Sequence, residues 1–479
     1  MFDEWVKVTH MKAKIHKFEQ NGSYILLDIN SGAVHVIDKL AYEIMDYFDG
    51  TNDAAVLGQM AGRYPRGEVE EVLSELHALM DEHQLFAPDI DVPPTFRQQG
   101  LVKSLCLMVA QDCNMRCKYC FGDGGSYGQE RAVMSPEVGK GAIDFLLSNC
   151  GPFRKHFEVD FFGGEPLMNM QTVQAVTEYA RRMEKERKVH FKLTMTTNGL
   201  LLNDENIKWL NDNHISVVLS TDGRRETHDR MRPDAGGQGT YDRVMRNFKK
   251  FVDSRKGEAY YMRGTYTREN LDFTEDVLAM QDAGFDVLSM EPVVLKDGPL
   301  ALREADLPRI YEEYDRLVDA YLQRHREGRG FFFFHFNMDL SNGPCVAKRL
   351  SGCGSGHEYF AIAENGDIYP CHQFVGREQY LMGNIYEGVT NRKLSRYFRE
   401  SHVLNKEKCR GCWARFFCSG GCHANDDLFH GDIRKSYELG CEIQKKRLEC
   451  ALYVQAMLAL EKMEQGEKVG EFTTAEPIH

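Results

Sequence analysis

The chain has 479 residues, with 59 Lys and Arg against 72 Asp and Glu, which gives a formal net charge of −13. Hydrophobic residues make up 42% and charged residues 27%, an ordinary globular composition that excludes a disordered or collagen-like chain. At about 100–200 residues per domain this length predicts two to four domains, and the acidic balance argues against nucleic acid as the main partner.

The lack of long apolar segments indicates where in the cell the protein resides, and this location bears on the state of its cysteines. No run reaches the roughly 18 apolar residues that a membrane helix needs, and the N-terminal MFDEWVKVTHMKAK lacks the apolar core of a signal peptide. We therefore expect a cytoplasmic protein without a membrane partner. Its 14 cysteines would stay reduced there, so they indicate metal, redox or catalytic roles rather than disulfides.

Residues 12–88 are predicted to form a small unit. Two β-prone runs, Ser23–Ile29 and Ala33–Ile37, flank an Asn-Ser-Gly turn and predict a hairpin. Helical patterns follow, the best of them over residues 69–80, where apolar side chains share one helix face. A hairpin with three short helices predicts a winged-helix-like module, and residues 89–100 read as a linker.

Residues 101–300 alternate strand-like and helix-like segments. The strand candidates are Leu101–Ala110, Val159–Phe162, His190–Thr196, Val217–Thr221, Tyr260–Thr267 and Val287–Val294. Repeated βα units predict a parallel sheet with helices outside, an α/β partial barrel whose site lies at the carboxyl ends of the strands. A bridging region (301–344), a cysteine-rich domain (345–450) and a helix end with a polar tail (451–479) complete the predicted organisation.

A first cysteine group follows the first of these strands. Cys113, Cys117 and Cys120 stand in QDCNMRCKYCF with the spacing Cx3Cx2C. Three thiolates on one loop can hold three irons of a [4Fe–4S] cluster and leave the fourth iron open to a small molecule. The alternatives are a zinc site or three unrelated thiols; zinc usually takes four ligands in two pairs, and the next cysteine is Cys150.

The motif CNMRCKYC in this position resembles the signature of radical S-adenosylmethionine (SAM) enzymes, and the resemblance runs from Leu101 to about Val294. It implies that SAM chelates the open iron and is reductively cleaved to a 5′-deoxyadenosyl radical. The SAM contacts that it implies are Gly163, Gly164, Glu165, Asn198, Ser220 and Arg232. Each motif alone could be an ordinary turn or βα loop, and Arg224 and Arg230 compete for the carboxylate-binding role of Arg232.

A second cysteine group resembles the SPASM domain, and tandem zinc ribbons are its alternative. Its members are Cys353, Cys371, Cys409, Cys412, Cys418, Cys422 and Cys441, with Cx2Cx5Cx3C in the middle. The resemblance implies two auxiliary [4Fe–4S] clusters and three clusters in all: Cys353, Cys371 and Cys422 on one, and Cys409, Cys412, Cys418 and Cys441 on the other. Either Cys345 or a substrate thiolate would complete the former.

Two residues are weak catalytic candidates, and no catalytic residue is assigned. Sulfatase-maturing relatives carry an Asp directly after the Gx4C cysteine, where this chain has His372. A histidine can also take a proton, so the difference weakens a sulfatase role without excluding it; His372 could equally be an exposed or capping residue. Glu291, at the end of the sixth strand, faces the expected cavity.

The segment KIHKFEQNGSYILLDINSGAVHVID resembles the peptide-recognition element of enzymes that modify ribosomally made peptides, which binds a leader as an added strand. The whole chain resembles maturases that form cysteine thioether crosslinks, the SCIFF maturases in particular. This implies a cysteine-rich precursor with a leader as substrate, and an electron donor such as ferredoxin or flavodoxin. Sulfatase formylglycine formation, carbon–carbon crosslinking, epimerisation and a zinc-bearing peptide- or DNA-binding role are the alternatives.

Overall fold

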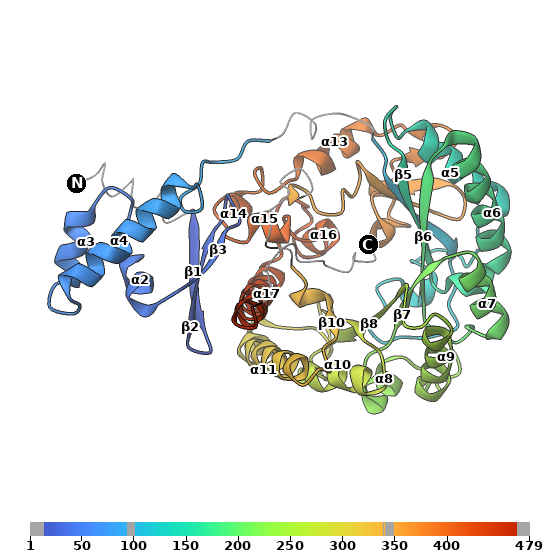
Figure 1. Cartoon of the computed structure of the whole chain (residues 1–479). Coiled ribbons are helices and arrows are strands. Elements are labelled where there is room, and N and C mark those ends of the chain that lie inside the picture. The colour runs from blue at the N-terminus through green and yellow to red at the C-terminus, as the bar shows by residue number, and fades with distance from the viewer. Residues whose placement is uncertain (1–13, 93–100, 339, 341–348, 467–479) are drawn as a thin grey trace.

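A partial barrel forms the centre of the molecule (Figure 1). The computed structural model describes residues 14–92, 101–338, 340 and 349–466. One sheet has the order β10-β9-β8-β7-β6-β5-β4-β11-β12-β13-β14. Its parallel core lies at the six predicted places: β4 (Ser104–Ala110), β5 (His156–Gly163), β6 (His190–Thr197), β7 (Ser216–Ser220), β8 (Tyr260–Tyr266) and β9 (Val287–Pro292). The predicted α/β partial barrel is therefore confirmed.

Helices cover the outer face of this sheet (Figure 1). They are α5 (Pro136–Ser148), α6 (Met170–Arg187), α7 (Asp204–Asp212), α8 (Arg225–Met231), α9 (Tyr241–Ser254), α10 (Phe273–Asp282) and α11 (Leu307–Arg326). In α9 the buried side chains Val244, Phe248 and Phe251 recur at helical spacing, so one stripe of the helix packs on the strands. No helix in the described part of the chain is long and apolar enough to cross a membrane.

The cysteine-rich region continues the barrel sheet. Strand β11 (Tyr359–Ile362) pairs in parallel with β4, and β12 (Asp367–Tyr369), β13 (Gly383–Asn384) and β14 (Gly388–Val389) follow in antiparallel order. At the other edge β10 (Phe332–Phe333) pairs with β9. The helices of this region are α13 (Arg392–Glu400), α14 (Glu407–Arg410), α15 (Arg415–Cys418), α16 (His423–His430) and α17 (Glu438–Glu464). Helix α17 runs without a break through the boundary predicted at residue 450.

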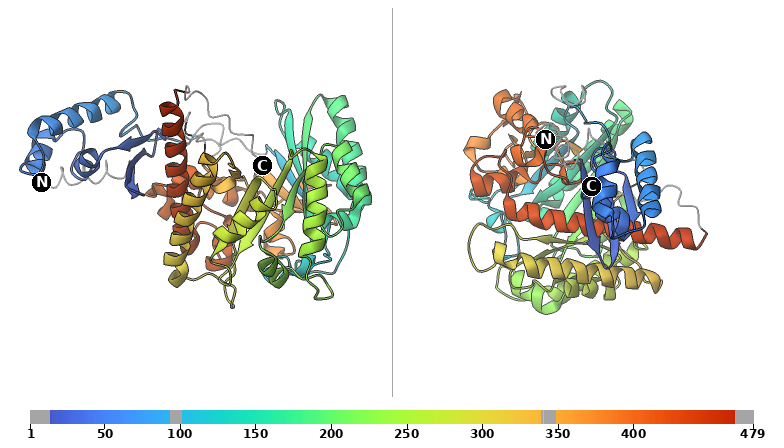
Figure 2. Two further views of the ribbon diagram at one scale, coloured as in Figure 1. Left: turned by 60° about the horizontal axis from the view of Figure 1, so that its bottom comes forward. Right: turned by 90° about the vertical axis from the view of Figure 1, so that its left-hand side faces the viewer.

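The N-terminal unit projects from one end of the molecule (Figure 2). An antiparallel sheet of β1 (Ile15–Gln20), β2 (Ser23–Asp28) and β3 (Val34–Ile37) packs against α2 (Lys39–Ile44), α3 (Asp53–Met60) and α4 (Arg66–Asp81). Its own core includes Leu26, Phe48 and Leu73. The predicted hairpin and three helices are present, and β1 adds a strand that the prediction lacked.

The other face of this small sheet packs on the main body. The His16 ring stacks on Trp413 with centroids 3.8 Å apart, and its Nε2 lies 2.8 Å from Glu449 of α17. The Gln20 amide donates to Asp315 of α11 at 3.0 Å. The N-terminal sheet is therefore held between its own helices and the helices α11 and α17.

Candidate functional site

Three cysteines lie together at the carboxyl ends of the parallel strands. Cys113, Cys117 and Cys120 line a pocket on the loop after β4. Five of the six residues predicted to contact SAM line the same pocket: Gly163, Gly164, Asn198, Ser220 and Arg232. Segments that are far apart in sequence thus converge on the cysteine loop.

The two glycines after β5 allow the backbone to pass against this loop. A Cβ atom on Gly164 would lie 2.1 Å from the Asp112 carbonyl oxygen, and one on Gly163 would lie 2.2 Å from that of Ala110. Both distances are far inside van der Waals contact. The Gly-Gly pair is therefore required by the packing of the chain on itself, which adds a structural reason to its predicted role in ligand contact.

The Glu165 carboxylate is fully buried and forms hydrogen bonds with other groups of the chain. It accepts hydrogen bonds from Thr197 Oγ1 at 2.7 Å, Asn198 N at 2.8 Å and Leu167 N at 3.1 Å. Burial raises its pKa to about 7, although these donors oppose the shift. Glu165 is absent from the described pocket lining, so its contact with a SAM amino group stays a prediction.

Arg232 reaches the pocket from the segment after α8. Its Nη1 donates to the Tyr119 hydroxyl at 2.8 Å and lies 3.8 Å from Asp222, whose carboxylate accepts from Tyr119 at 2.8 Å. Arg232 Nε is buried and has no hydrogen-bond partner among the described residues. The Tyr119 hydroxyl and the Asp222 carboxylate therefore fix the position of the guanidinium.

A buried histidine fixes the backbone that carries Arg232. His228 lies 3.0 Å from Thr221 Oγ1 through Nδ1 and 3.0 Å from Thr240 Oγ1 through Nε2, and Thr240 Oγ1 donates to the Arg232 carbonyl at 2.7 Å. Burial, aided by the Arg232 charge, lowers the pKa of His228 to about 3. A neutral imidazole therefore bridges the end of β7 to the turn before α9. The sequence reasoning missed His228 and Tyr119, although Tyr119 lies within the cysteine motif.

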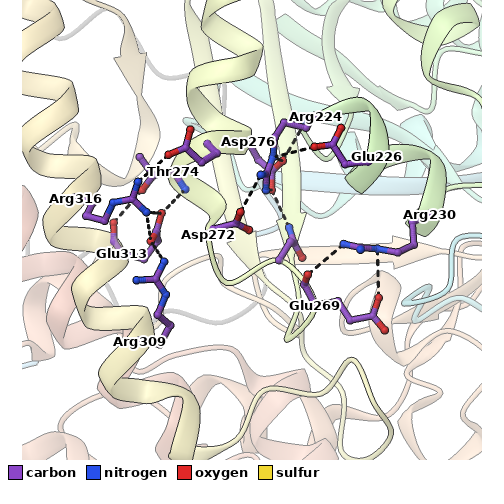
Figure 3. Close-up of polar contacts among 12 residues, drawn as sticks. Arg224, Glu226, Arg230, Glu269, Asp272, Thr274, Asp276, Arg309, Glu313 and Arg316 are labelled. Atoms are coloured by element: carbon purple, nitrogen blue, oxygen red, sulfur yellow. Dashed lines mark hydrogen bonds and ion pairs between the residues drawn. The ribbon is translucent and has the colours of Figure 1, made fainter.

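Arg224 and Arg230, the alternatives to Arg232 for binding the SAM carboxylate, have acidic partners outside the pocket (Figure 3). Arg224 binds Asp276 at 2.7 Å and Asp272 at 2.8 Å, and Arg230 binds Glu269 at 3.3 Å. Neither lines the pocket. Of the three arginines, Arg232 alone is placed beside the cysteines.

The later cysteines form two groups. Burial raises the pKa of Cys371, and the nearby thiols of Cys422 and Cys353 add to this shift. Burial likewise raises the pKa of Cys441, and the thiols of Cys418, Cys409 and Cys412 add to it. Burial, with the neighbouring thiols adding to it, raises the pKa of Cys422 to about 11 and that of Cys441 to about 12. The role of these cysteines as ligands of two auxiliary clusters stays a prediction. Cys345 lies outside the described residues.

The two weak catalytic candidates are both packed against other side chains. The half-buried His372 ring lies 4.8 Å from Phe162 and 5.5 Å from Phe121 between centroids, so it is not the exposed residue that the alternative describes. Burial and the Arg263 charge lower its pKa to about 4, which makes it a weak base. The Glu291 carboxylate is held by His335 Nε2 at 3.0 Å and by Ser289 at 2.8 Å.

Comparison with known proteins identifies the domains. The model of the radical SAM superfamily matches residues 107–288, and that of the SPASM iron–sulfur cluster-binding domain matches residues 353–413. The chain carries a radical SAM domain and a SPASM domain. This confirms the family expected from CNMRCKYC and from the second cysteine group.

Relatives of this radical SAM enzyme include anaerobic sulfatase-maturating enzymes. A cysteine-type anaerobic sulfatase-maturating enzyme of Clostridium novyi is 25% identical over 68% of this chain and 90% of its own. The solved structure of native anSMEcpe with bound AdoMet and Cp18Cys peptide covers 75% of this chain and 99% of its own, with 21% identity and a TM-score of 0.60. The structure of Streptococcus suis SuiB bound to S-adenosylmethionine covers 89% of this chain and 98% of its own, with 16% identity and a TM-score of 0.51. The two structures support the fold.

The first cysteine group fits a SAM-binding cluster. Its donors are all thiols, and Arg232 lines the pocket beside them; a guanidinium suits a carboxylate. In the described ranges, no three His, Cys, Asp or Glu side chains converge on a single metal ion. The ligands of a [4Fe–4S] cluster each bind a different iron and need not converge. Cys113, Cys117 and Cys120 are the residues that would hold this cluster in the radical SAM domain.

Arg232→Gln should weaken SAM binding. Losing a charge-assisted hydrogen bond costs about 1.5–3 kcal/mol, so the dissociation constant for SAM should rise roughly tenfold to a hundredfold. Equilibrium dialysis with reconstituted protein measures it. Arg230→Gln is the matched control, because Arg230 points to Glu269 instead, and it should bind SAM like the wild type. Equal affinities for all three proteins would contradict the role of Arg232.

Proposed function

We propose that this radical SAM/SPASM enzyme is a maturase that forms cysteine thioether crosslinks in a ribosomally made, cysteine-rich precursor peptide. The observation that carries the proposal is the N-terminal three-stranded sheet, which is joined directly to the SPASM region through His16 and Trp413. A unit of this form offers a strand edge to a leader peptide. The peptide bound to anSMEcpe supports a peptide as the substrate class.

Strand β3 is the proposed docking edge for the leader. It pairs with β2 on one side only, and within the described residues its outer edge has no backbone partner. Val36 of β3 is 41% exposed, so an added strand would both satisfy the free backbone groups and cover an apolar side chain. The unit rests on α17, which also supplies Cys441 to the second auxiliary group.

Three [4Fe–4S] clusters and SAM are the proposed cofactors, with ferredoxin or flavodoxin as the electron donor. When bound, the first cluster and SAM supply the 5′-deoxyadenosyl radical that removes a hydrogen atom from the peptide. The chain's own part is placement: Arg232 lines the pocket and would bind the SAM carboxylate, and Asn198 holds the cysteine loop through Asn114 at 2.8 Å. Cys345 or a peptide thiolate completes the first auxiliary set.

The mass of the product tests the proposal. Reconstituted enzyme is incubated anaerobically with SAM, dithionite and a leader-bearing precursor that contains cysteines. A thioether crosslink retains the sulfur, loses two hydrogen atoms and protects that cysteine from alkylation. An unchanged mass would indicate epimerisation, and loss of sulfur would indicate the second candidate, sulfatase-type formylglycine formation, which the Clostridium novyi relative favours. Either result would contradict thioether formation.

A further inference from the structure

An arginine on β8 faces the interior of the partial barrel. Tyr260, Met262 and Tyr266 of this strand are 2%, 0% and 0% exposed and belong to the core under the outer helices. Arg263 lies at an odd-numbered position of the strand, between these buried residues, and is exposed. Since successive side chains of a strand point to opposite faces, the Arg263 side chain leaves the sheet on its inner side.

Strand register places Arg263 next to the pocket. Its Cα pairs with that of Ser220 on β7 and with that of Ser289 on β9. Ser220 lines the pocket that contains Cys113, Cys117 and Cys120. Neighbouring strands lie about 4.8 Å apart, and side chains in register share a face. The guanidinium therefore lies on the inner face one strand away from the pocket wall.

The Arg263 side chain makes no hydrogen bond or ion pair with any of the described residues, in contrast to Arg224, whose acidic partners are drawn in Figure 3. The acid one strand away is Glu291, which is in register with Thr265. Glu291 is already held by His335 at 3.0 Å, and Arg447 lies 3.7 Å from its other oxygen. The positive charge of Arg263 is therefore not neutralised by a direct partner.

The Arg263 charge acts on the carboxylate of Glu291. Burial would raise the pKa of Glu291, but His335, Arg263 and Arg447 together hold it well below its usual value. Glu291 is already paired with His335 and Arg447, so it does not need the hydrogen bonds of Arg263.

We propose that Arg263 binds a carboxylate of the peptide substrate and thereby places the adjoining residue beside the SAM pocket. The inference rests on the proposed function in that the substrate is a peptide. A guanidinium offers two parallel N–H donors that match a carboxylate, so binding also fixes orientation. The carboxylate could belong to an Asp or Glu side chain or to the peptide C-terminus. In either form Arg263 is a specificity-determining residue.

Affinity selection without turnover tests this directly. SAM-loaded, reconstituted enzyme without reductant is mixed with synthetic cysteine-containing peptides in matched pairs, Asp against Asn and Glu against Gln, each with a free or an amidated C-terminus. Captured peptides are quantified by mass spectrometry. The variants are Arg263→Gln, the charge reversal Arg263→Asp, and Arg246→Gln as the control. Arg246 is an exposed arginine on α9, outside the barrel, and has no hydrogen bond or ion pair in the described part of the chain.

Wild type and Arg246→Gln should enrich the carboxylate member of one pair type about tenfold, as one charge-assisted hydrogen bond of roughly 1.5 kcal/mol implies. Arg263→Gln should lose this enrichment, and Arg263→Asp should reverse it in favour of the uncharged member of the same pair, because a carboxylate at position 263 repels a second carboxylate. The pair type that responds identifies the side chain or the C-terminus as the source. Equal capture within all pairs by wild type, enrichment that persists in Arg263→Gln, or loss of SAM affinity in that variant would overturn the proposal. Because capture needs no catalysis, a carboxylate preference without thioether product would contradict the proposed function alone.

Discussion

Cys117→Ala is expected to abolish SAM cleavage while the protein stays folded. Cys117 lines the pocket between Cys113 and Cys120, and the three thiols provide all the protein ligands of the proposed SAM-binding cluster. Without one of them an iron has no protein ligand and the cluster is not retained in a form that binds SAM. The measurement is 5′-deoxyadenosine after reduction of reconstituted protein with dithionite, quantified by chromatography.

Cys150→Ala is the matched control for this variant. Cys150 is buried just after α5 in the hydrophobic core, outside all three cysteine groups, and its thiol donates to the backbone carbonyls of Leu147 and Gly151. This variant should form 5′-deoxyadenosine like the wild type. If Cys117→Ala also formed it at the wild-type rate, the cysteine loop would not be the site of SAM cleavage.

Lys406→Ala should be the most destabilising single replacement in the cysteine-rich region. Lys406 and Asp426 form an ion pair at 2.6 Å with side chains only 1% and 3% exposed, and Lys406 Nζ also donates to the Gly420 carbonyl at 2.8 Å. Removing the lysine leaves a buried carboxylate without its counter-ion, which costs about 3–5 kcal/mol. The free energy of unfolding of reconstituted protein in urea measures this loss.

Two further variants separate this effect from a general loss of packing. Lys408→Ala removes one partner of Glu438, which His430 also binds. The Lys408 and Glu438 side chains are 63% and 49% exposed, so this variant should cost less than about 1 kcal/mol. The double variant Lys406→Met/Asp426→Leu removes both charges and should recover most of the stability lost in Lys406→Ala. Equal losses in Lys406→Ala and Lys408→Ala would show that the buried pair does not stabilise this region.

The six central strands could be predicted because each is a local run of apolar or β-branched residues, as in Val217–Leu219 of β7. Strand pairing between distant segments of the chain could not be predicted. Strand β11 joins the sheet beside β4 although more than two hundred residues separate them. The first strand of the N-terminal unit was missed because Ile15–Gln20 is largely polar outside Ile15 and Phe18. Its place becomes clear only from its partner β2 and from α17.

The candidate site also combines features that short sequence motifs predict with contacts that only the fold creates. The cysteine spacing and the glycine pair indicated the pocket correctly, since these residues lie in short motifs. The choice of Arg232 over Arg224 depended on Asp272 and Asp276, which are about fifty residues away in sequence and bind Arg224 only in the fold. The hydrogen bonds that the Glu165 carboxylate accepts within the chain could not be predicted for the same reason. Their donors Thr197 and Asn198 lie at the end of the next strand.

The most direct test of the account is the iron and sulfide content per chain after anaerobic reconstitution. It is measured for wild type and for the triple variant with Cys113, Cys117 and Cys120 all changed to Ala, with zinc determined in parallel. The account predicts about twelve irons per chain in wild type and about eight in the variant, which corresponds to three [4Fe–4S] clusters with one of them on the first loop. Zinc with little iron, or iron that does not fall in the variant, would contradict it.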